Sequence, residues 1–401
     1  MRLIDESSAA DYLRESGRIA DDERVRVRLL TGGVSNIVLR ISFDSTERED
    51  WVVKQAREQL RVADPWFCGV ERIWREVETL RICADCLRDE RQTDFAADDG
   101  FRFSVPQVVF EDRENYLYAM SAAPAEHIVW KRQLLRGVAD RRIAAACGKL
   151  LGRLHARTWN DSGVANQLAD RSFFEQLRVD PYYRFAAEQR PEFREYLEPL
   201  IASLVENRHS LVHGDFSPKN LLLFQHEVML VDFEVGHFGD PAFDLGFFLT
   251  HIVLKAIHLG NREPEAPAES LWEPNAPADS LREPEAPAEF APAPEAPADS
   301  TPASNAPTKH PTSTYLQLGD AFWNHYAQTM RPVIGDSAFT ELERRAMLNL
   351  AGCLIARVDG KSKAEYLTDE RQQEIVRQTA RMIFAAPLSS WSEATASLHS
   401  R

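Results

Sequence analysis

The sequence predicts an α+β chain made of two lobes, a small N-terminal lobe built on an antiparallel sheet and a larger, mainly helical C-terminal lobe. Between residues 25 and 120, short apolar runs separated by polar turns show the alternation that is typical of strands. Beyond residue 120, apolar residues recur about every 3.6 positions, which is typical of helices packed against a core. At 401 residues, 44% of them hydrophobic, the chain is long enough to form both lobes.

The N-terminal lobe is expected to span residues 1–120. Ser7 or Ser8 is a candidate cap for a helix that ends near Glu15, because serine side chains accept hydrogen bonds from the free backbone amides of a first helical turn. A long helix is expected at 70–87. The expected strands, of which the first three pair antiparallel, are 25–29, 37–43, 51–55, 105–110 and 116–120.

The C-terminal lobe is expected to span residues 121–401. The segment 120–124, where the strand pattern changes to a helical one, is the candidate hinge between the lobes. A short strand pair is expected at 221–224 and 228–231. The expected helices are 141–158, 193–205, 243–259, 315–329 and 341–357.

An insertion of unusual composition interrupts this lobe at residues 261–313. It holds 12 of the chain's 22 prolines and three near-copies of a ten-residue unit that begin at Glu263, Glu273 and Glu283. Proline lacks a backbone donor and apolar residues other than alanine are few, so burial would not offset the entropy of ordering the segment. Ten acidic and three basic residues give it a net charge of −7, nearly half of the chain's −15. We expect a disordered segment between two helices rather than a packed repeat.

The overall charge and the cysteine content restrict the partners and the compartment. A formal net charge of −15 opposes binding to nucleic acid and to anionic membranes, so neither partner is expected. The first residues show no apolar signal region, and the most apolar stretch is interrupted by Asp244, His251 and Lys255. Five cysteines, an odd number, argue against a disulfide framework. The expected compartment is the cytoplasm.

The segments HGDFSPKN (213–220) and VDFE (231–234) carry the strongest functional signal. Asp215 lies five residues before Asn220, as the base and the metal-binding amide do in a kinase catalytic loop, and Asp232 follows the next apolar run. A transferred phosphoryl group spreads negative charge over its oxygens, so it requires Mg²⁺ on hard oxygen ligands and a carboxylate facing the attacking hydroxyl. We predict that Asp215 is the catalytic base and that Asn220 and Asp232 bind Mg²⁺, with ATP as the donor. The alternative is an ordinary loop between short strands.

A glycine turn between the first two strands is predicted to cover the phosphates of ATP. Gly32 and Gly33 are followed by Ser35 and Asn36, which add donors where triphosphate oxygens would lie. Two adjacent glycines are not a GxGxxG fingerprint, and by themselves they favour an ordinary hairpin turn. The assignment therefore depends on the neighbouring motifs.

Lys54 lies in an apolar strand, where burying its charge would be costly without a partner. Glu76, on the expected helix 70–87, is the preferred partner, and the ion pair would orient Lys54 toward the α and β phosphates. Glu78 is the competing partner, and otherwise it lies on a solvated helix face. We assign Lys54, Glu76 and, at the candidate hinge, Met120 to the nucleotide site.

Together these motifs resemble the aminoglycoside phosphotransferase and choline kinase superfamily of small-molecule kinases. The resemblance covers nearly the whole chain outside the insertion, and it implies a protein-kinase-like fold, ATP, Mg²⁺ and the roles given above for Asp215, Asn220 and Asp232. It also implies that Asp244 braces the catalytic loop. The motifs that carry it are GGVSN (32–36), the strand lysine, RE (75–76), GRLHART (152–158), HGDFSPKN and VDFEVGHFGDPAFDLG (231–246).

The stretch VKQAREQLRVADPW (53–66) is similar to the corresponding part of methylthioribose kinases. This similarity is partial. Those enzymes typically have DPE where this chain has DFE at 232–234, no asparagine at the position of Asn220, and an arginine pair where this chain has Ala356 and Arg357. The segment 357–362 either reaches the acceptor pocket or is a charged loop that ends a helix.

We therefore predict an enzyme that transfers the γ-phosphoryl group of ATP to a hydroxyl of a small polar molecule. A methylthioribose-like sugar kinase and an aminoglycoside phosphotransferase are the specific alternatives. Protein substrates rank lower, because the chain lacks an evident activation segment ending in APE. A catalytically silent nucleotide-binding scaffold is the alternative of another class. Glu234, His237 and Asp240 either face the acceptor or support the metal site.

Overall fold

The computed structural model describes residues 1–30, 35–45, 48–60, 66–88, 100–260, 311–385, 388 and 390–399. The predicted glycine turn, with Gly32 and Gly33, lies outside these residues. So does the predicted insertion, apart from 311–313, which form the first turn of a helix instead.

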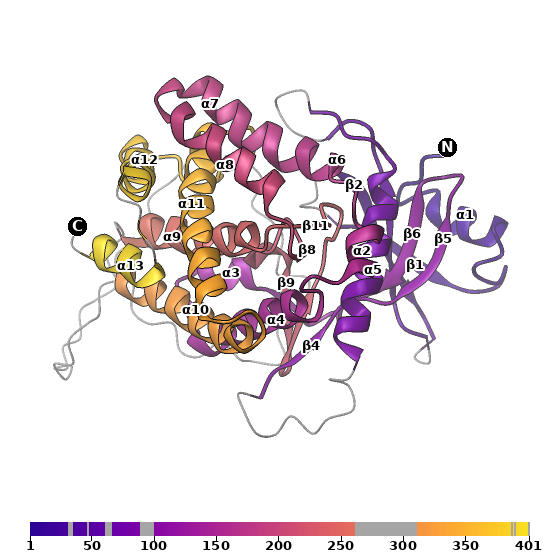
Figure 1. Ribbon diagram of the computed structural model, residues 1–401. Helices are drawn as coiled ribbons and strands as arrows, with labels where there is room; N and C mark the ends of the chain where they lie inside the picture. The colour runs from indigo at the N-terminus through magenta and orange to yellow at the C-terminus, as the bar shows by residue number, and fades with distance from the viewer. Residues whose placement is uncertain are drawn as a thin grey trace, which may run out of the picture.

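A five-stranded antiparallel sheet forms the centre of the N-terminal part (Figure 1). The first three strands match the predicted ranges to within one residue at each end. The strand predicted at 105–110 begins at Val108 instead, because Pro106 has no amide to donate to the ladder. In spatial order the strands are β1 (Val25–Leu29), β2 (Asn36–Phe43), β3 (Trp51–Ala56), β6 (Leu117–Ser121) and β5 (Val108–Asp112). The two helices of this part are α1 (Ala9–Glu15) and α2 (Arg72–Cys86).

The two faces of this sheet belong to different cores, because side chains alternate along each strand. Leu39 and Val53 lie in the core on the face that α1 covers. Val52 and Ala56 lie in the larger core that contains the apolar residues of α2. Lys54 has the same parity as Val52 and Ala56, so the strand directs its side chain toward α2.

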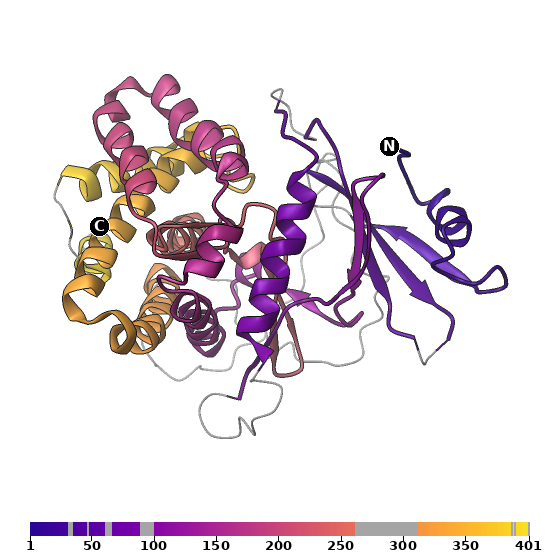
Figure 2. The ribbon, with the colours of Figure 1, turned by 45° about the vertical axis from the view of Figure 1, so that its right-hand side comes forward.

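Helix α2 stands between the sheet and the helical part of the molecule (Figure 2). Ile73, Val77 and Leu80 recur at helical spacing and are buried. Glu76 lies on the same side and is also fully buried. Because a buried carboxylate is costly without a partner, this position demands a cation or several donors nearby.

The second sheet carries the motif predicted to be catalytic. Its central strands β9 and β10 form an antiparallel hairpin in which Leu221 faces Leu230. Strand β4 pairs with β10 in parallel, so backbone hydrogen bonds join the segment before residue 120 to the C-terminal part. The strands in spatial order are β4 (Arg102–Ser104), β10 (Glu227–Leu230), β9 (Leu221–Phe224) and β7 (Ile128–Val129), and a separate pair is formed by β8 (Ser210–Val212) and β11 (His237–Gly239).

Helices make up most of the chain beyond residue 129 (Figure 1). All five predicted helices are present, and the two expected at 315–329 and 341–357 extend by two or more residues at both ends. Apolar spacing did not reveal the π-helical segment η2, which contains Pro181 and a mixed polar sequence. The elements are α3 (Trp130–Leu135), α4 (Arg141–Arg157), α5 (Ser162–Gln167), α6 (Ser172–Phe174), η2 (Glu175–Arg184), α7 (Phe185–Gln189), η3 (Pro191–Phe193), α8 (Arg194–Glu206), η4 (Pro218–Asn220), α9 (Ala242–Gly260), α10 (Pro311–Ile334), α11 (Asp336–Asp359), α12 (Glu370–Ala385) and α13 (Trp391–His399).

Helix α9 forms the centre of the helical part and packs against α10 and α11. Within the described ranges it is the one helix long and apolar enough to cross a membrane, but 89% of its most apolar window is buried inside the protein. Its apolar character is therefore explained by its place in the core. The predicted α+β class, with an antiparallel sheet followed by a larger helical part, is confirmed.

Candidate functional site

The open end of the β9–β10 hairpin brings the two predicted metal ligands together. Asn220 lies directly before β9 and Asp232 lies two residues after β10, and the antiparallel register places both at the same end. The backbone amide of Val231 donates to the carbonyl of Asn220 at 3.1 Å, which extends the ladder to the site. Asp232 has a φ of +74°, a left-handed conformation that is uncommon outside glycine. Such backbone outliers concentrate at functional turns.

Asp215 lies in the loop between β8 and η4, and side chains hold this loop from both directions. The side-chain amide of Asn220 donates to the backbone carbonyl of Asp215 at 2.9 Å. The backbone amide of Asp215 donates to Nδ1 of His213 at 3.1 Å. Burial lowers the pKa of His213, so its neutral ring can accept this bond. His213 thus has a structural role in this loop.

The carboxylate of Asp215 is almost completely buried between two cations. Oδ2 lies 3.1 Å from Nη2 of Arg178 and 2.8 Å from Nζ of Lys219. Oδ1 makes no hydrogen bond within the described part of the chain. One oxygen is therefore held by two cations, whereas the other has no hydrogen-bond partner in the described part of the chain. Neither cation was predicted from the sequence. Lys219 lies inside the HGDFSPKN motif and could have been considered there. Arg178 comes from η2, and no motif in the sequence marks it.

Asp244, at the start of α9, braces the loop that carries Asp215, as the family resemblance implied. Its two oxygens accept hydrogen bonds from the backbone amides of His213, at 2.7 Å, and Gly214, at 2.8 Å. His155 of α4 lies 3.3 Å from the same carboxylate. Burial alone would raise the pKa of Asp244, but these histidines and backbone donors lower it. The ionised carboxylate therefore fixes the loop to two helices of the core.

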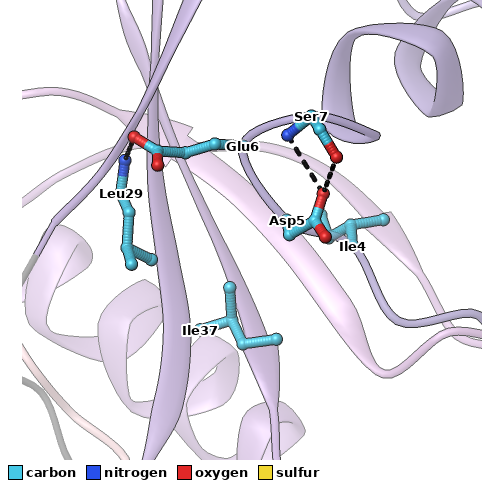
Figure 3. Close-up of a pocket in the computed structure, with 6 residues that line it drawn as sticks. All are labelled: Ile4, Asp5, Glu6, Ser7, Leu29 and Ile37. Atoms are coloured by element: carbon cyan, nitrogen blue, oxygen red, sulfur yellow. Dashed lines mark hydrogen bonds between the residues drawn. The ribbon is translucent and has the colours of Figure 1, made fainter.

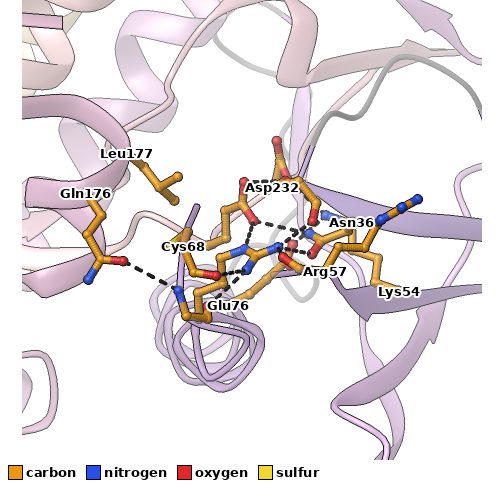
Figure 4. Close-up of polar contacts among 12 residues, drawn as sticks. Asn36, Lys54, Arg57, Cys68, Glu76, Gln176, Leu177 and Asp232 are labelled. Atoms are coloured by element: carbon orange, nitrogen blue, oxygen red, sulfur yellow. Dashed lines mark hydrogen bonds and ion pairs between the residues drawn. The ribbon is translucent and has the colours of Figure 1, made fainter. Parts of the chain in front are cut away.

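Lys54 joins α2 to the turn that follows β10. Its Nζ lies 2.5 Å from Oε1 of Glu76 and 2.9 Å from Oδ1 of Asp232 (Figure 4). The same Glu76 oxygen accepts the backbone amide of Phe233 at 3.3 Å. Burial alone would lower the pKa of Lys54, but Asp232 and Glu76 raise it well above its usual value. Lys54 is thus a fixed cation beside a predicted metal ligand.

The structure distinguishes Glu76 from its competitor. Glu78 pairs with Arg75 at 3.3 Å, and its side chain is 41% exposed. Glu78 therefore lies on a solvated face of the helix, which was the alternative considered for it in the sequence analysis. Glu76, two residues earlier on the helix, is fully buried and has in Lys54 the partner that its burial requires.

Ser35 and Asn36, predicted to face the triphosphate, instead contact Glu234 in this structure. The hydroxyl of Ser35 donates to Glu234 at 2.7 Å, and the amide of Asn36 donates to its other oxygen at 3.2 Å. Arg72, the first residue of α2, donates to Glu234 at 3.2 Å (Figure 4 shows this network). Contact with phosphate would therefore require Ser35 and Asn36 to exchange partners. Met120 is buried in β6, with its sulfur 3.4 Å from the hydroxyl of Tyr118.

The other residues considered for the acceptor site also have partners inside the protein. Asp240 is paired with Arg345 at 2.7 Å. His237 is buried, and its Nδ1 lies 3.1 Å from the carbonyl of Val235. Both residues therefore support the turns around the site.

Two hollows in the described surface lie away from this cluster. The first, of about 290 Å³, lies beside β1, and the second, of about 470 Å³, lies between the segment after β3 and η2. None of the predicted site residues lines either of them, so we assign them no role in catalysis. The first is lined by Ile4, Asp5, Glu6, Ser7, Leu29 and Ile37 (Figure 3).

Known proteins are similar to this chain in sequence. Residues 26–273 match the model of a phosphotransferase enzyme family. A methylthioribose kinase of Bacillus velezensis is 23% identical over 280 residues, which cover 63% of this chain and 67% of that kinase. Methylthioribose kinase 2 of Oryza sativa subsp. japonica is 22% identical over 290 residues, which cover 63% of each chain. The chain thus aligns with about two thirds of the length of these relatives.

Solved structures share the fold. An ethanolamine kinase of Plasmodium vivax superposes with a TM-score of 0.50 and 11% identity, over 96% of this chain and 92% of that one. A choline kinase of Cryptosporidium parvum superposes with a TM-score of 0.50 and 11% identity, over 96% of this chain and 99% of that one. The predicted kinase-like fold, with a sheet lobe and a helical lobe, is confirmed.

Proposed function

Since the chain belongs to the phosphotransferase enzyme family, we propose that it transfers the γ-phosphoryl group of ATP to a hydroxyl of a small polar molecule. The observation that carries the proposal is the convergence of a base candidate, two oxygen ligands and a fixed lysine. Asp215 and Asn220 come from one loop, Asp232 comes from the following turn, and Lys54 reaches them from β3. Phosphoryl transfer depends on positioning and on charge stabilisation, and this set of side chains supplies both.

The donor set at the hairpin fits Mg²⁺. The amide nitrogen of Asn220 is held by the carbonyl of Asp215, which leaves its side-chain oxygen for a cation, and Asp232 adds a carboxylate. Among the described residues no three His, Cys, Asp or Glu side chains form a metal site of their own. Mg²⁺ in kinases commonly takes one or two protein oxygens and completes its shell with phosphate and water. Bound there, it would neutralise charge on the β and γ phosphates.

The protein side chains divide the remaining work. Oδ1 of Asp215 accepts the proton of the acceptor hydroxyl as the hydroxyl oxygen attacks the γ-phosphoryl group of ATP. Arg178 and Lys219 hold Oδ2 in place. Lys54, oriented by Glu76, faces the α and β phosphates. Ser35, Asn36 and Met120 are assigned to the nucleotide site, and residues 1–120 act as the nucleotide-binding lobe.

The acceptor belongs to the class of small hydroxyl compounds. The named relatives act on methylthioribose, which supports a sugar-like acceptor, and an aminoglycoside is the second specific candidate. We place the reaction in the cytoplasm.

The test is ADP release by the purified protein with Mg²⁺ and ATP, measured with and without neutral, cationic and anionic hydroxyl compounds. We expect release that depends on Mg²⁺ and increases with at least one acceptor, with a phosphorylated product visible by ³¹P NMR. Nucleotide binding without turnover on any acceptor would instead identify a silent nucleotide-binding protein.

A further inference from the structure

Lys255, in the C-terminal half of the core helix α9, is fully buried and has no carboxylate partner among the described residues. Its Nζ donates to the carbonyl of His251 at 3.1 Å and lies 5.4 Å from the centre of the Tyr366 ring. A carbonyl and an aromatic face replace only part of the hydration of an ammonium group. Burial, followed by the charges of Lys131 and Arg357, lowers the pKa of Lys255 well below its usual value. The packing of α9 does not explain why a lysine occupies this place.

Further cations approach the same point from other elements. Lys131 comes from α3, Lys219 from η4 and Arg357 from the last turn of α11. After burial itself, the charges of Lys255, Arg357, Lys219 and Lys131 lower the pKa of the buried His251, so all four act on one imidazole. Four separate elements thus direct positive charge to one region.

The carboxylates of this region balance the charge only in part. Glu365 lies 3.6 Å from Lys131, but its side chain is 87% exposed, so water screens the pair. Nη1 of Arg357 donates to the hydroxyl of Ser362 at 2.6 Å rather than to a carboxylate. Within the described ranges, the cluster therefore retains an excess of positive charge.

Three buried polar atoms at this cluster have no hydrogen-bond partner in the described part of the protein. They are Nε2 of His251, the hydroxyl of Tyr366 and Nε of Arg357. Buried polar atoms in native proteins almost always have a partner, so a group of three calls for one. The tyrosine hydroxyl and the arginine nitrogen are donors, which suits a ligand that carries acceptor oxygens.

The cluster lies next to the proposed reaction centre. Nζ of Lys219 is 2.8 Å from the carboxylate of Asp215, and α3, which carries Lys131, packs against both η4 and α9. All of its members come from the helical part of the chain. An acceptor whose hydroxyl meets Asp215 would therefore place its opposite end among these cations.

We propose that the phosphoryl acceptor carries an anionic group, a carboxylate or a phosphate, and that Lys131, Lys255, Arg357, His251 and Tyr366 bind this group. The inference rests on the proposed kinase function and specifies its substrate class. An anion supplies a counter-ion to Lys255. Its oxygens also accept hydrogen bonds from the donors that otherwise have no partner. Binding of the distant anionic group also positions the hydroxyl at Asp215.

Acceptor pairs of one carbon skeleton, with and without an anionic group, test the proposal. D-glycerate and glycerol 3-phosphate are compared with glycerol, and ribose 5-phosphate with ribose, using full-length protein and Mg²⁺-ATP. We expect at least one anionic member to have a kcat/KM more than tenfold above that of its neutral parent. The carboxylate and phosphate members separate the two possible anions. Equal or better turnover of the neutral parents would overturn the proposal.

Variants then locate the anion site. Lys255→Met and Arg357→Met should raise the KM for the anionic acceptor at least tenfold while leaving the KM for ATP within twofold. Lys363→Met, at an exposed lysine close in sequence, is the matched control and should behave as wild type. An unchanged acceptor KM in both cluster variants would show that these cations bind nothing in the reaction.

A binding measurement separates this inference from the kinase function itself. With the nucleotide site filled by Mg²⁺ and a non-hydrolysable ATP analogue, inorganic phosphate is titrated calorimetrically into wild type, Lys255→Met and Lys363→Met. We expect millimolar binding that Lys255→Met alone abolishes, even if no acceptor is turned over. Nucleotide binding with no phosphate binding would refute the anion site and leave the kinase proposal standing.

Discussion

The side-chain amide of Asn220 donates a hydrogen bond of 2.9 Å to the backbone carbonyl of Asp215. One residue therefore serves two parts of the proposed site, since its nitrogen shapes the loop of the base and its oxygen remains for a metal ion. This explains why an asparagine, rather than an aspartate, suits the position, because a carboxylate has no donor for the carbonyl. The base and the metal site are thus coupled in geometry.

Replacing Asp215 with Asn should lower turnover by about two orders of magnitude or more, because general-base catalysis and positioning typically contribute 10² to 10⁴ in rate. Asparagine keeps the shape of the side chain but cannot accept the proton as a carboxylate does. Binding of Mg²⁺-ATP, measured by calorimetry, should persist. A variant with near wild-type turnover would remove Asp215 from the mechanism.

Replacing Asp232 with Ala should weaken binding of Mg²⁺-ATP and shift the Mg²⁺ dependence of turnover to higher concentrations. The change removes one of two proposed protein ligands and also one of the two carboxylates that hold Lys54. A Mg²⁺ titration of activity at saturating ATP is the measurement. Overlapping titration curves for the variant and the wild type would contradict the assignment.

Replacing Asp244 with Ala should destabilise the protein and abolish turnover together. Two buried backbone amides, of His213 and Gly214, would lose their acceptor, at a cost of about 1–3 kcal/mol each. Asp244→Asn keeps one acceptor oxygen and should lose less stability. Urea denaturation measures both variants, and equal free energies of unfolding for Asp244→Ala and wild type would disprove the bracing role.

Stability should fall as the pH decreases below 6.5, in part because of His237. Burial lowers the pKa of His237 from 6.5 to about 3, so between these values the unfolded chain binds a proton that the folded chain does not. The free energy of unfolding then decreases by about 1.4 kcal/mol per pH unit for one such group, and the full stability is present above pH 6.5.

The histidine variants test this dependence. His237→Asn retains a donor for the carbonyl of Val235 but cannot titrate, so its loss of stability between pH 7.5 and 5.5 should be smaller than that of wild type. His226→Asn, in the exposed turn between β9 and β10, should follow the wild-type curve. Parallel curves for His237→Asn and wild type would exclude His237 as a contributor.

Deleting residues 262–310 and joining the ends with a short Gly-Ser linker should leave the melting temperature and the activity nearly unchanged. The prediction comes from composition, because a proline-rich segment with little apolar content has little surface to bury. Loop closure adds only about 0.6 kcal/mol for each doubling of length. A melting temperature lower by many degrees would show that the segment packs on the folded part.

The sequence by itself determined the order of the elements and the identity of the central motif. Strands β1, β2 and β3 and helices α4 and α9 follow from apolar period, which is a property of neighbouring residues. The spacing of Asp215 and Asn220 is likewise local, because one short loop holds both. Lys54 was recognisable because a charge in an apolar strand requires a partner.

Only the tertiary structure decided which distant side chains meet these residues. It placed Arg178 of η2 on Asp215, and Glu234 between Arg72 and the donors that were predicted to face phosphate. It also gathered Lys131, Lys255 and Arg357 from three helices. Such contacts depend on how helices pack and on which side chains satisfy one another's charge, and residues far apart in the chain carry no spacing that records them.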